Sequence, residues 1–191
     1  MSLTATPNGD RVQIAIFGRR NAGKSSVINA VTGQQLAIVS DVKGTTTDPV
    51  YKAMEILPIG PCMFIDTPGL DDEGALGRMR VEKAIEVLNR TDIAMLVLDV
   101  SRLTKQELES GRGMGAEEEQ ILAMIEEKKL PYVIVLNQAD KLSGEELTHR
   151  RQCIMAKNGT VPVCAVSTVQ NMGLDALKDA LVMLAPDTDL K

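Results

Sequence analysis

The chain has 191 residues, a net charge of −5 at pH 7 and a sequence pI of about 5.0. Its 44% hydrophobic and 25% charged residues are typical of a globular protein, which excludes a wholly disordered chain, and no apolar run approaches the ~20 residues of a membrane span. The acidic balance and the scarcity of aromatic residues (two Tyr, two Phe, no Trp) argue against nucleic acid as a partner.

The N-terminus lacks the basic and apolar stretches of a signal peptide, so we expect a cytoplasmic protein without a membrane partner. Its three cysteines, Cys62, Cys153 and Cys164, form no C-x-x-C pair. An odd number without such spacing predicts free thiols rather than a disulfide framework or a metal cluster.

Short apolar segments alternate with longer amphipathic segments along the chain. The predicted strands are Val12–Phe17, Val50–Leu57, Cys62–Ile65, Ile93–Asp99, Tyr132–Leu136 and Val161–Val166. The predicted helices are Lys24–Thr32, Gly77–Asn89, Glu117–Lys129, Ser143–Lys157 and Leu174–Leu184. This alternation predicts an α/β fold of βαβ units around a mostly parallel sheet.

Two details refine this fold. Only a short Pro-Ile-Gly-Pro turn separates the second predicted strand from the third, which predicts a hairpin and one antiparallel edge strand. The polar stretch Arg102–Gly115 contains three glycines and is predicted to be a loop. We expect one domain over residues 11–185, a flexible N-terminus over 1–10, and a tail or the start of a linker over 186–191.

The segment GRRNAGKSS follows the first predicted strand and opens the first predicted helix. Gly18, Gly23, Lys24 and Ser25 fit the phosphate-binding pattern G-x-x-x-x-G-K-[ST]. The glycines let successive backbone N–H groups wrap a phosphate, and the helix N-terminus adds partial positive charge. Lys24 is expected to reach the β- and γ-phosphates and Ser25 to ligate Mg²⁺. The nucleotide-binding residues predicted in this loop are Asn21, Ala22, Gly23, Lys24, Ser25 and Ser26.

The next motif, DVKGTTTDPV over Asp41–Val50, places three consecutive threonines before an Asp-Pro pair. One of these hydroxyls is expected to complete the set of Mg²⁺ ligands. The loop is expected to become ordered when the nucleotide binds, so that its conformation depends on whether the γ-phosphate is present. A threonine-rich strand start is the alternative interpretation.

The motif DTPGL, Asp66–Leu70, comes directly after a predicted strand. A carboxylate at the end of a strand can hold Mg²⁺, so Asp66 is the candidate, and Gly69 leaves its N–H free to approach a γ-phosphate. An ordinary turn would look the same in isolation. Its position some 40 residues after the phosphate-binding loop favours the functional interpretation.

Two motifs late in the chain follow further predicted strands. In NQAD, Asn137–Asp140, the carboxylate of Asp140 can accept hydrogen bonds from guanine N1 and N2, which adenine cannot supply. Asn137 is expected to connect this segment to the phosphate-binding loop. In the last motif, the backbone of Ser167 and Thr168 is expected to meet the guanine carbonyl; alone, it is an ordinary loop between a strand and a helix.

The ordered set GRRNAGKS, GTTT, DTPG, NQAD and VST resembles the five guanine-nucleotide motifs of P-loop GTPases and covers essentially the whole chain. The segments GRRNAGKSSVINAVTGQ and GTTTD resemble the TrmE–Era–EngA branch of that family. Within the branch, GRRNAGKSS, AIVSDVKGTTTDPVYKAME and IDTPGLDDEGALGRMRVEKA resemble the GTPase domain of HydF, the FeFe-hydrogenase maturation scaffold.

The resemblance implies a three-layer Ras-like fold with five parallel strands and one antiparallel strand. It implies slow, Mg²⁺-dependent hydrolysis of GTP to GDP and phosphate, with Lys24, Thr46 and Gly69 as catalytic residues. Thr46 would ligate Mg²⁺ together with Ser25 and Asp66, with Thr45 as the second choice, and Asn21 would ligate K⁺. The guanine-nucleotide contacts would be completed by Thr45, Thr46, Asp66, Gly69, Asn137, Gln138, Asp140, Ser167 and Thr168.

The same resemblance implies partners. Complete HydF proteins continue into a dimerisation domain and an iron–sulfur domain, so an excised GTPase domain would hold no iron–sulfur cluster itself. Its expected partners are those C-terminal domains, the hydrogenase and other maturation proteins, and a second copy in a nucleotide-dependent dimer.

The sequence departs from the usual motifs of the family at three positions, and two alternative functions remain open. Gln138 replaces the usual lysine of the base motif, Thr168 replaces the usual alanine, and Leu70 stands where Ras-type enzymes place the glutamine that orients water. The alternatives are a GTPase that acts in tRNA modification or ribosome assembly, and a nucleotide-gated interaction module with negligible turnover.

Overall fold

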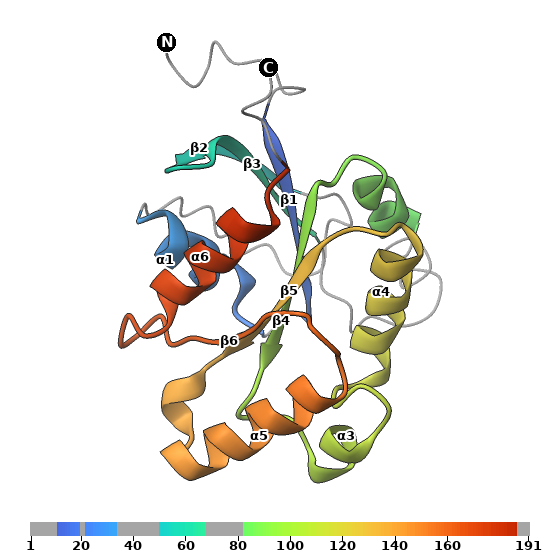
Figure 1. The fold of residues 1–191 in the computed structure, drawn as a ribbon, viewed down its shortest axis with the longest axis vertical. Coiled ribbons are helices and arrows are strands. Elements are labelled where there is room, and N and C mark those ends of the chain that lie inside the picture. The colour runs from blue at the N-terminus through green and yellow to red at the C-terminus, as the bar shows by residue number, and fades with distance from the viewer. Residues whose placement is uncertain (1–10, 20–21, 34–49, 68–81, 187–191) are drawn as a thin grey trace.

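The computed structural model describes residues 11–19, 22–33, 50–67 and 82–186. A six-stranded sheet forms the centre of the molecule, with strand order β2-β3-β1-β4-β5-β6 (Figure 1). The strands are β1 (Val12–Gly18), β2 (Val50–Ile56), β3 (Gly60–Asp66), β4 (Ile93–Asp99), β5 (Tyr132–Asn137) and β6 (Val163–Ala165). Every neighbouring pair is parallel except β2 with β3, which is the antiparallel hairpin predicted from the sequence.

Helices cover both faces of the sheet. On one face lie α1 (Lys24–Thr32) and α6 (Leu174–Leu184), which pack against alternate residues of β1 such as Ile14 and Ile16. On the other face, Ala15 and Phe17 of the same strand meet residues of the helical stretch 82–88, of α4 (Ala116–Glu127) and of α5 (Gly144–Ala156). Because successive side chains of a strand point to opposite faces, one apolar strand supplies both cores, and the chain is a three-layer α/β structure.

The parallel strands bring the predicted motifs to one edge of the sheet. The register pairs Ile16 with Asp66, and Asp99 with Asn137. The carboxyl ends of β1, β3 and β5 therefore meet where GRRNAGKSS, DTPGL and NQAD begin. This edge, outside the carboxyl ends of the strands, is where open α/β sheets bind their ligands.

The segment predicted as a loop at 102–115 contains a short helix, α3 (Lys105–Glu109), so that prediction was wrong. A capping box explains the helix, because the Thr104 hydroxyl accepts from the Glu107 N–H while the Glu107 carboxylate accepts from the Thr104 N–H, both at 3.0 Å. These reciprocal bonds stabilise a helix that its few apolar residues do not reveal.

Other predicted boundaries shift by a few residues. The last strand is confined to Val163–Ala165, shorter than predicted, and the second half of the predicted helix Gly77–Asn89 is helical at 82–88, with 77–81 outside the described residues. The Ser143 hydroxyl caps α5 by accepting from the Glu146 N–H at 3.2 Å, and the carboxylate of Glu146 accepts from Arg150 Nε at 2.7 Å. In the described part of the chain, no helix has the length and apolarity needed to span a membrane.

Candidate functional site

At the described end of the loop between β1 and α1, the backbone has a conformation that glycine favours. Gly23, the residue before α1, has a φ of 87°, in the left-handed region that glycine adopts without strain. A Cβ at this position would also overlap Nδ2 of Asn137. The backbone conformation and the lack of space therefore both require glycine where α1 begins.

Lys24 is anchored inside this loop. Its ammonium donates hydrogen bonds to the carbonyl oxygens of Gly18 at 3.0 Å and Arg19 at 3.3 Å, and the residue is 7% exposed. A buried cation held by the carbonyls of Gly18 and Arg19 is fixed in place where α1 begins, which suits an anionic ligand.

Ser25 and Asp66 come together from α1 and the end of β3. The Ser25 hydroxyl donates to Asp66 Oδ2 at 3.4 Å, while Asp66 Oδ1 is buried without a hydrogen-bond partner. Burial raises the pKa of Asp66 above its ordinary value, and the positive charges of Lys24 and Lys52 and the Ser25 hydrogen bond oppose that increase.

This pair fits a magnesium ion. Hydroxyl and carboxylate oxygens are ligands that Mg²⁺ prefers, and two adjacent ligands at ~2.1 Å in an octahedron lie about 3 Å apart. The unpartnered Asp66 Oδ1 supplies an oxygen that a cation or its water would satisfy. The residues present therefore fit the metal ligation predicted for Ser25 and Asp66.

Thr67 is a site residue that the sequence interpretation missed. Its hydroxyl donates to the carbonyl of Ile16 at 2.6 Å, and its backbone N–H donates to the same oxygen at 3.2 Å. These two bonds fix the residue after Asp66 to β1, next to the phosphate-binding loop. The signal in the sequence is a polar residue directly after a buried strand.

Asn137 connects the NQAD segment to the phosphate-binding loop, as predicted. Its amide Nδ2 donates to the carbonyl of Ala22 at 2.9 Å, and the residue is 1% exposed. Gln138, which follows, has a φ of 64°, so the chain turns sharply as it leaves β5. The segment NQAD is thereby held against the phosphate-binding loop.

The carboxylate of Asp140 is oriented by a neighbouring loop. The Ser167 hydroxyl donates to Asp140 Oδ1 at 2.8 Å, and Ser167 is fully buried. The backbone N–H and C=O of Ser167 both bond to Met172, and its side-chain hydroxyl faces the Asp140 carboxylate. A carboxylate fixed in this way can accept from a ligand with adjacent N–H donors.

Several predicted site residues lie outside the described residues, namely Asn21, Thr45, Thr46 and Gly69. Among those described, Ser26 is exposed in the first turn of α1.

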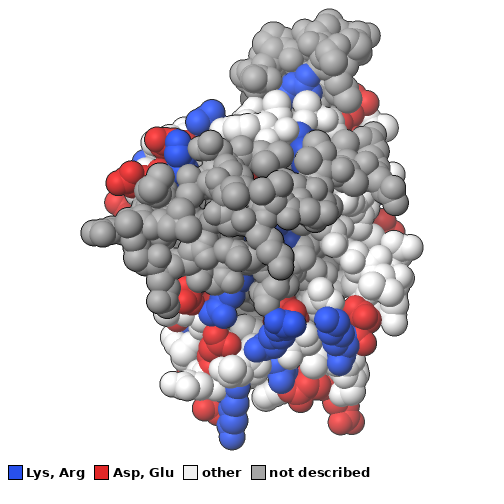
Figure 2. Space-filling view, turned by 180° about the vertical axis from the view of Figure 1, so that it is seen from behind, with Lys and Arg blue, Asp and Glu red and all other residues white. Residues whose placement is uncertain are grey.

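Figure 2 shows the opposite side of the molecule from Figure 1, where the described Lys and Arg side chains are interspersed with Asp and Glu.

Comparison with known proteins adds to this geometry. The family described as 50S ribosome-binding GTPase matches residues 13–138. The chain is similar to GTPase Der of Kosmotoga olearia, with 28% identity over 193 residues that cover 95% of this chain and 40% of Der. It is also similar to tRNA modification GTPase MnmE of Alkaliphilus oremlandii, with 33% identity over 168 residues that cover 87% of this chain and 32% of MnmE.

A solved structure shares the fold. The structure of Era in complex with MgGDPNP and nucleotides 1506–1542 of 16S ribosomal RNA superposes with a TM-score of 0.75 and 25% identity, over 92% of this chain and 57% of that one. This likeness confirms the Ras-like fold expected from the sequence. The chain spans less than two thirds of the length of each of these relatives.

Proposed function

We propose a guanine-nucleotide switch, on the premise that the chain belongs to the family of 50S ribosome-binding GTPases. The chain binds GTP and GDP, and it hydrolyses GTP to GDP and phosphate with slow turnover. The observation that carries this proposal is the hydrogen bond from Asn137 to Ala22. It holds the base motif and the phosphate-binding loop together, so that a single nucleotide contacts both.

Two of the described residues serve different parts of the nucleotide, Lys24 the phosphates and Asp140 the base. Lys24 places positive charge beside the enclosed space of the loop, where the β- and γ-phosphates lie, and stabilises negative charge that develops there during phosphoryl transfer. Asp140, oriented by Ser167, accepts from guanine and leaves a buried acceptor unpaired when adenine enters.

Mg²⁺ belongs to this proposal, with Ser25, Asp66 and Thr46 as its protein ligands. When bound, the ion neutralises phosphate charge as GTP is cleaved. The backbone N–H of Gly69 is proposed to donate to the γ-phosphate. Thr45, Gln138 and Thr168 complete the proposed nucleotide contacts.

A binding and turnover series on the full chain tests this function. We expect GTP and GDP to bind in preference to ATP, and phosphate release from GTP to require Mg²⁺. Binding without turnover would favour the nucleotide-gated interaction module, and equal affinity for ATP and GTP would contradict the assigned role of Asp140.

We propose K⁺ as a second cation of the reaction, held by Asn21. Support comes from the resemblance to the TrmE branch and from Leu70, whose apolar side chain cannot orient the attacking water. A monovalent cation beside the β- and γ-phosphates would supply counter-charge to the negative charge that develops there.

We further propose that this switch acts in the maturation of FeFe-hydrogenase, in the cytoplasm. The support is the extended resemblance of GTTTDPV and its flanking segments to HydF. Its partners would be the C-terminal domains of a longer protein, the hydrogenase and its other maturation proteins. A second copy of the chain would associate with it when nucleotide is bound.

A role in tRNA modification or ribosome assembly is the second candidate, because MnmE and Era are among the relatives. One experiment separates the two candidates. The natural gene is deleted from its host, and hydrogenase activity and tRNA modification are measured with and without a complementing copy. Loss of hydrogenase activity alone supports maturation, whereas loss of tRNA modification with intact hydrogenase supports the second candidate.

A further inference from the structure

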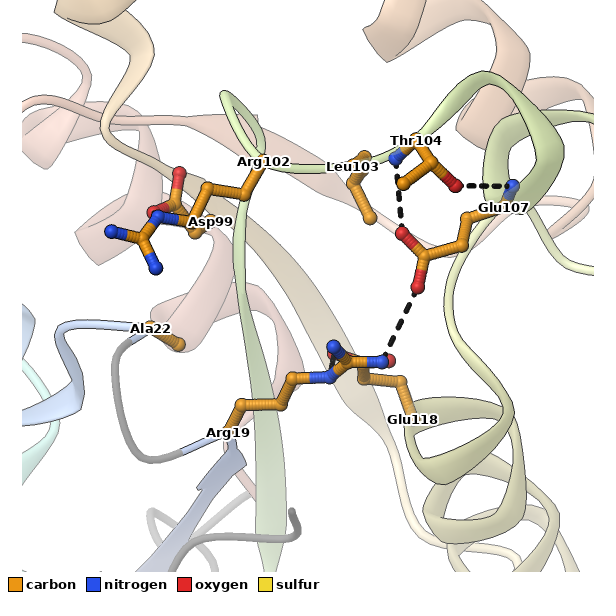
Figure 3. Close-up of a pocket in the computed structure, with 8 residues that line it drawn as sticks. All are labelled: Arg19, Ala22, Asp99, Arg102, Leu103, Thr104, Glu107 and Glu118. Carbon is orange, nitrogen blue, oxygen red and sulfur yellow. Dashed lines mark hydrogen bonds and ion pairs between the residues drawn. The ribbon is translucent and has the colours of Figure 1, made fainter.

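Arg19, the second residue of the phosphate-binding loop, directs its side chain into a cluster of carboxylates (Figure 3). Its Nη2 lies 2.9 Å from Glu117 Oε2 and 3.3 Å from Glu107 Oε2, and its Nε lies 3.0 Å from Glu118 Oε2. These partners come from α3 and from the first turn of α4. The cluster forms one wall of a cavity of about 280 Å³ between the loop, the end of β4 and α3.

The carboxylates of this cluster are themselves held in place. Glu107 belongs to the capping box of α3, where its other oxygen accepts from the Thr104 N–H. The Glu118 side chain is 5% exposed, and burial is the main cause that raises its pKa, with the positive charge of Arg19 opposing. Because Arg19 is the largest source of compensation for this buried carboxylate, their ion pair is costly to break.

Glycine at position 115 allows the start of α4 to lie close to the Arg19 side chain. This residue precedes α4 with an ordinary φ of −73°, so its backbone conformation does not require glycine. A Cβ at position 115 would nevertheless overlap both Arg19 Nη2 and Glu118 Oε1. Glycine at this position therefore provides the space that the guanidinium occupies.

The backbone of Arg19 has a different set of partners, on the side of the nucleotide. Its carbonyl accepts from the Lys24 ammonium at 3.3 Å and from the backbone N–H of Ala22 at 3.1 Å. The carbonyl of Ala22 in turn accepts from Asn137. Arg19 thus joins the carboxylate cluster directly to the backbone that holds Lys24.

We propose that Arg19 is a positioning residue for GTP hydrolysis, which acts through Lys24 rather than by contact with the nucleotide. The guanidinium fixes the backbone of residue 19 against α3 and α4, and the carbonyl of that residue then holds the Lys24 ammonium at the phosphates. Displacement of α3 or of the N-terminus of α4 would therefore alter catalysis. This inference rests on the proposed GTPase function.

The expected signature is a change in turnover rather than in affinity. Misplacement of a catalytic group by about 1 Å can cost ~100-fold in rate. We expect Arg19→Ala to lower kcat about 10-fold or more while KM for GTP changes less than about threefold. Arg19→Lys keeps the charge but loses the planar fork that reaches three carboxylates, so it should recover only part of the loss.

The test measures kcat, KM and the melting temperature for the full chain, six single variants and one double variant. The single variants are Arg19→Ala, Arg19→Lys, Glu118→Gln, Gly115→Ala, Arg102→Ala and Gly144→Ala. Arg102 lines the same cavity but pairs with Asp99 at 3.5 Å, so its variant is the matched control and should keep the unmutated kcat. Gly144→Ala controls for an added methyl group, because a Cβ there meets nothing within 4 Å.

The double variant Arg19→Ala with Glu118→Gln should be about as slow as Arg19→Ala alone, because both changes break one cluster. Unchanged kcat in Arg19→Ala, or a fall in kcat that merely matches the lost folded fraction, overturns the inference. Equal slowing in Arg102→Ala does so as well. If Arg19→Ala does not fold, kcat is measured for Arg19→Lys and Gly115→Ala instead, and an unchanged kcat in these two variants overturns the inference. Absence of turnover in the unmutated chain would instead contradict the proposed function.

Discussion

The Ser167 hydroxyl donates a 2.8 Å hydrogen bond to the carboxylate of Asp140, across 27 positions of sequence. The Ser167 oxygen also accepts from the backbone N–H of Gln170 at 3.1 Å, which fixes the direction of the hydroxyl. Two loops that follow different strands, β5 and β6, therefore position the Asp140 carboxylate.

Replacement of Ser167 by alanine is expected to weaken GTP binding about 10-fold, because hydrogen bonds to charged groups are worth about 1.5–3 kcal/mol. Titration calorimetry with GDP measures the loss. Gln170→Ala is the control, since it keeps the backbone N–H that bonds to Ser167. If the affinity of Ser167→Ala equals that of the control, the hydroxyl does not orient Asp140 for binding.

Asp140→Asn should reverse the preference for the base. The amide places a donor where the carboxylate accepted, so GTP should lose at least ~10-fold in affinity while xanthosine triphosphate, whose C2 oxygen is an acceptor, gains. Competition between the two nucleotides measures the ratio. A variant that keeps the full preference for GTP would show that another group reads the base.

Lys24→Ala should abolish nucleotide binding or hydrolysis. The change removes the ammonium that Gly18 and Arg19 hold within the loop, and with it the charge directed at the β- and γ-phosphates. Calorimetry with GDP and phosphate release from GTP are the measurements. Unchanged affinity together with unchanged turnover would refute the role of Lys24.

Turnover should be several-fold higher in K⁺ than in Na⁺ at equal ionic strength. Asn21→Ala should erase this difference while GDP binding stays largely intact, because the proposed cation serves the developing charge rather than the ground state. Equal rates in the two salts for the unmutated chain would remove K⁺ from the mechanism.

Stability should fall at alkaline pH because of two buried groups. Burial raises the pKa of the Cys62 thiol to about 11, from an ordinary value of 9.0. Burial and the Glu126 carboxylate raise the pKa of Tyr132 to about 12, from 10.0. Above pH 9 the unfolded chain loses these protons first, so the folded state binds more protons and the free energy of unfolding decreases as pH rises.

Urea unfolding between pH 8 and pH 11 measures this loss. Cys62→Ala should flatten the decline between pH 9 and pH 11 relative to the unmutated chain. Cys153→Ala, at a half-buried helix position, is the control that should keep the original slope. If both variants and the unmutated chain decline in parallel, Cys62 is not responsible.

The sequence predicts local structure and motif positions well, because period and turn chemistry are local. The strand Ile93–Asp99 and the helices Lys24–Thr32 and Leu174–Leu184 are found with the predicted bounds. The helix α3 was missed because its stability comes from the capping box of Thr104 and Glu107 rather than from an apolar stripe.

The sequence does not predict which side chains pair when they are far apart along the chain. Arg19 meets Glu107 and Glu117 across 88 and 98 positions, and many charged residues could have taken their places. Nothing in the pattern GRRNAGKSS indicates that its first arginine contacts α3 and α4. Such partners follow only from the way in which the layers pack, whereas Asn137 was predicted because its motif fixes its neighbourhood.

The register of the hairpin β2–β3 has a mechanical consequence. Residues 34–49 lead directly into Val50, residues 68–81 follow soon after Asp66, and Val50 pairs with Asp66 on one rung of the ladder. A displacement of Val50 would therefore be shared with Asp66, because the two residues are paired on the ladder.

The far end of the hairpin lies six residues away, at the pair Ile56 and Gly60, which at about 3.3 Å per residue is roughly 20 Å from the rung of Val50 and Asp66. Because β3 is also paired with β1 from Cys62 to Asp66, the hairpin is held to the rest of the sheet along most of β3. The exposed Leu57 lies at the turn, beyond that pairing.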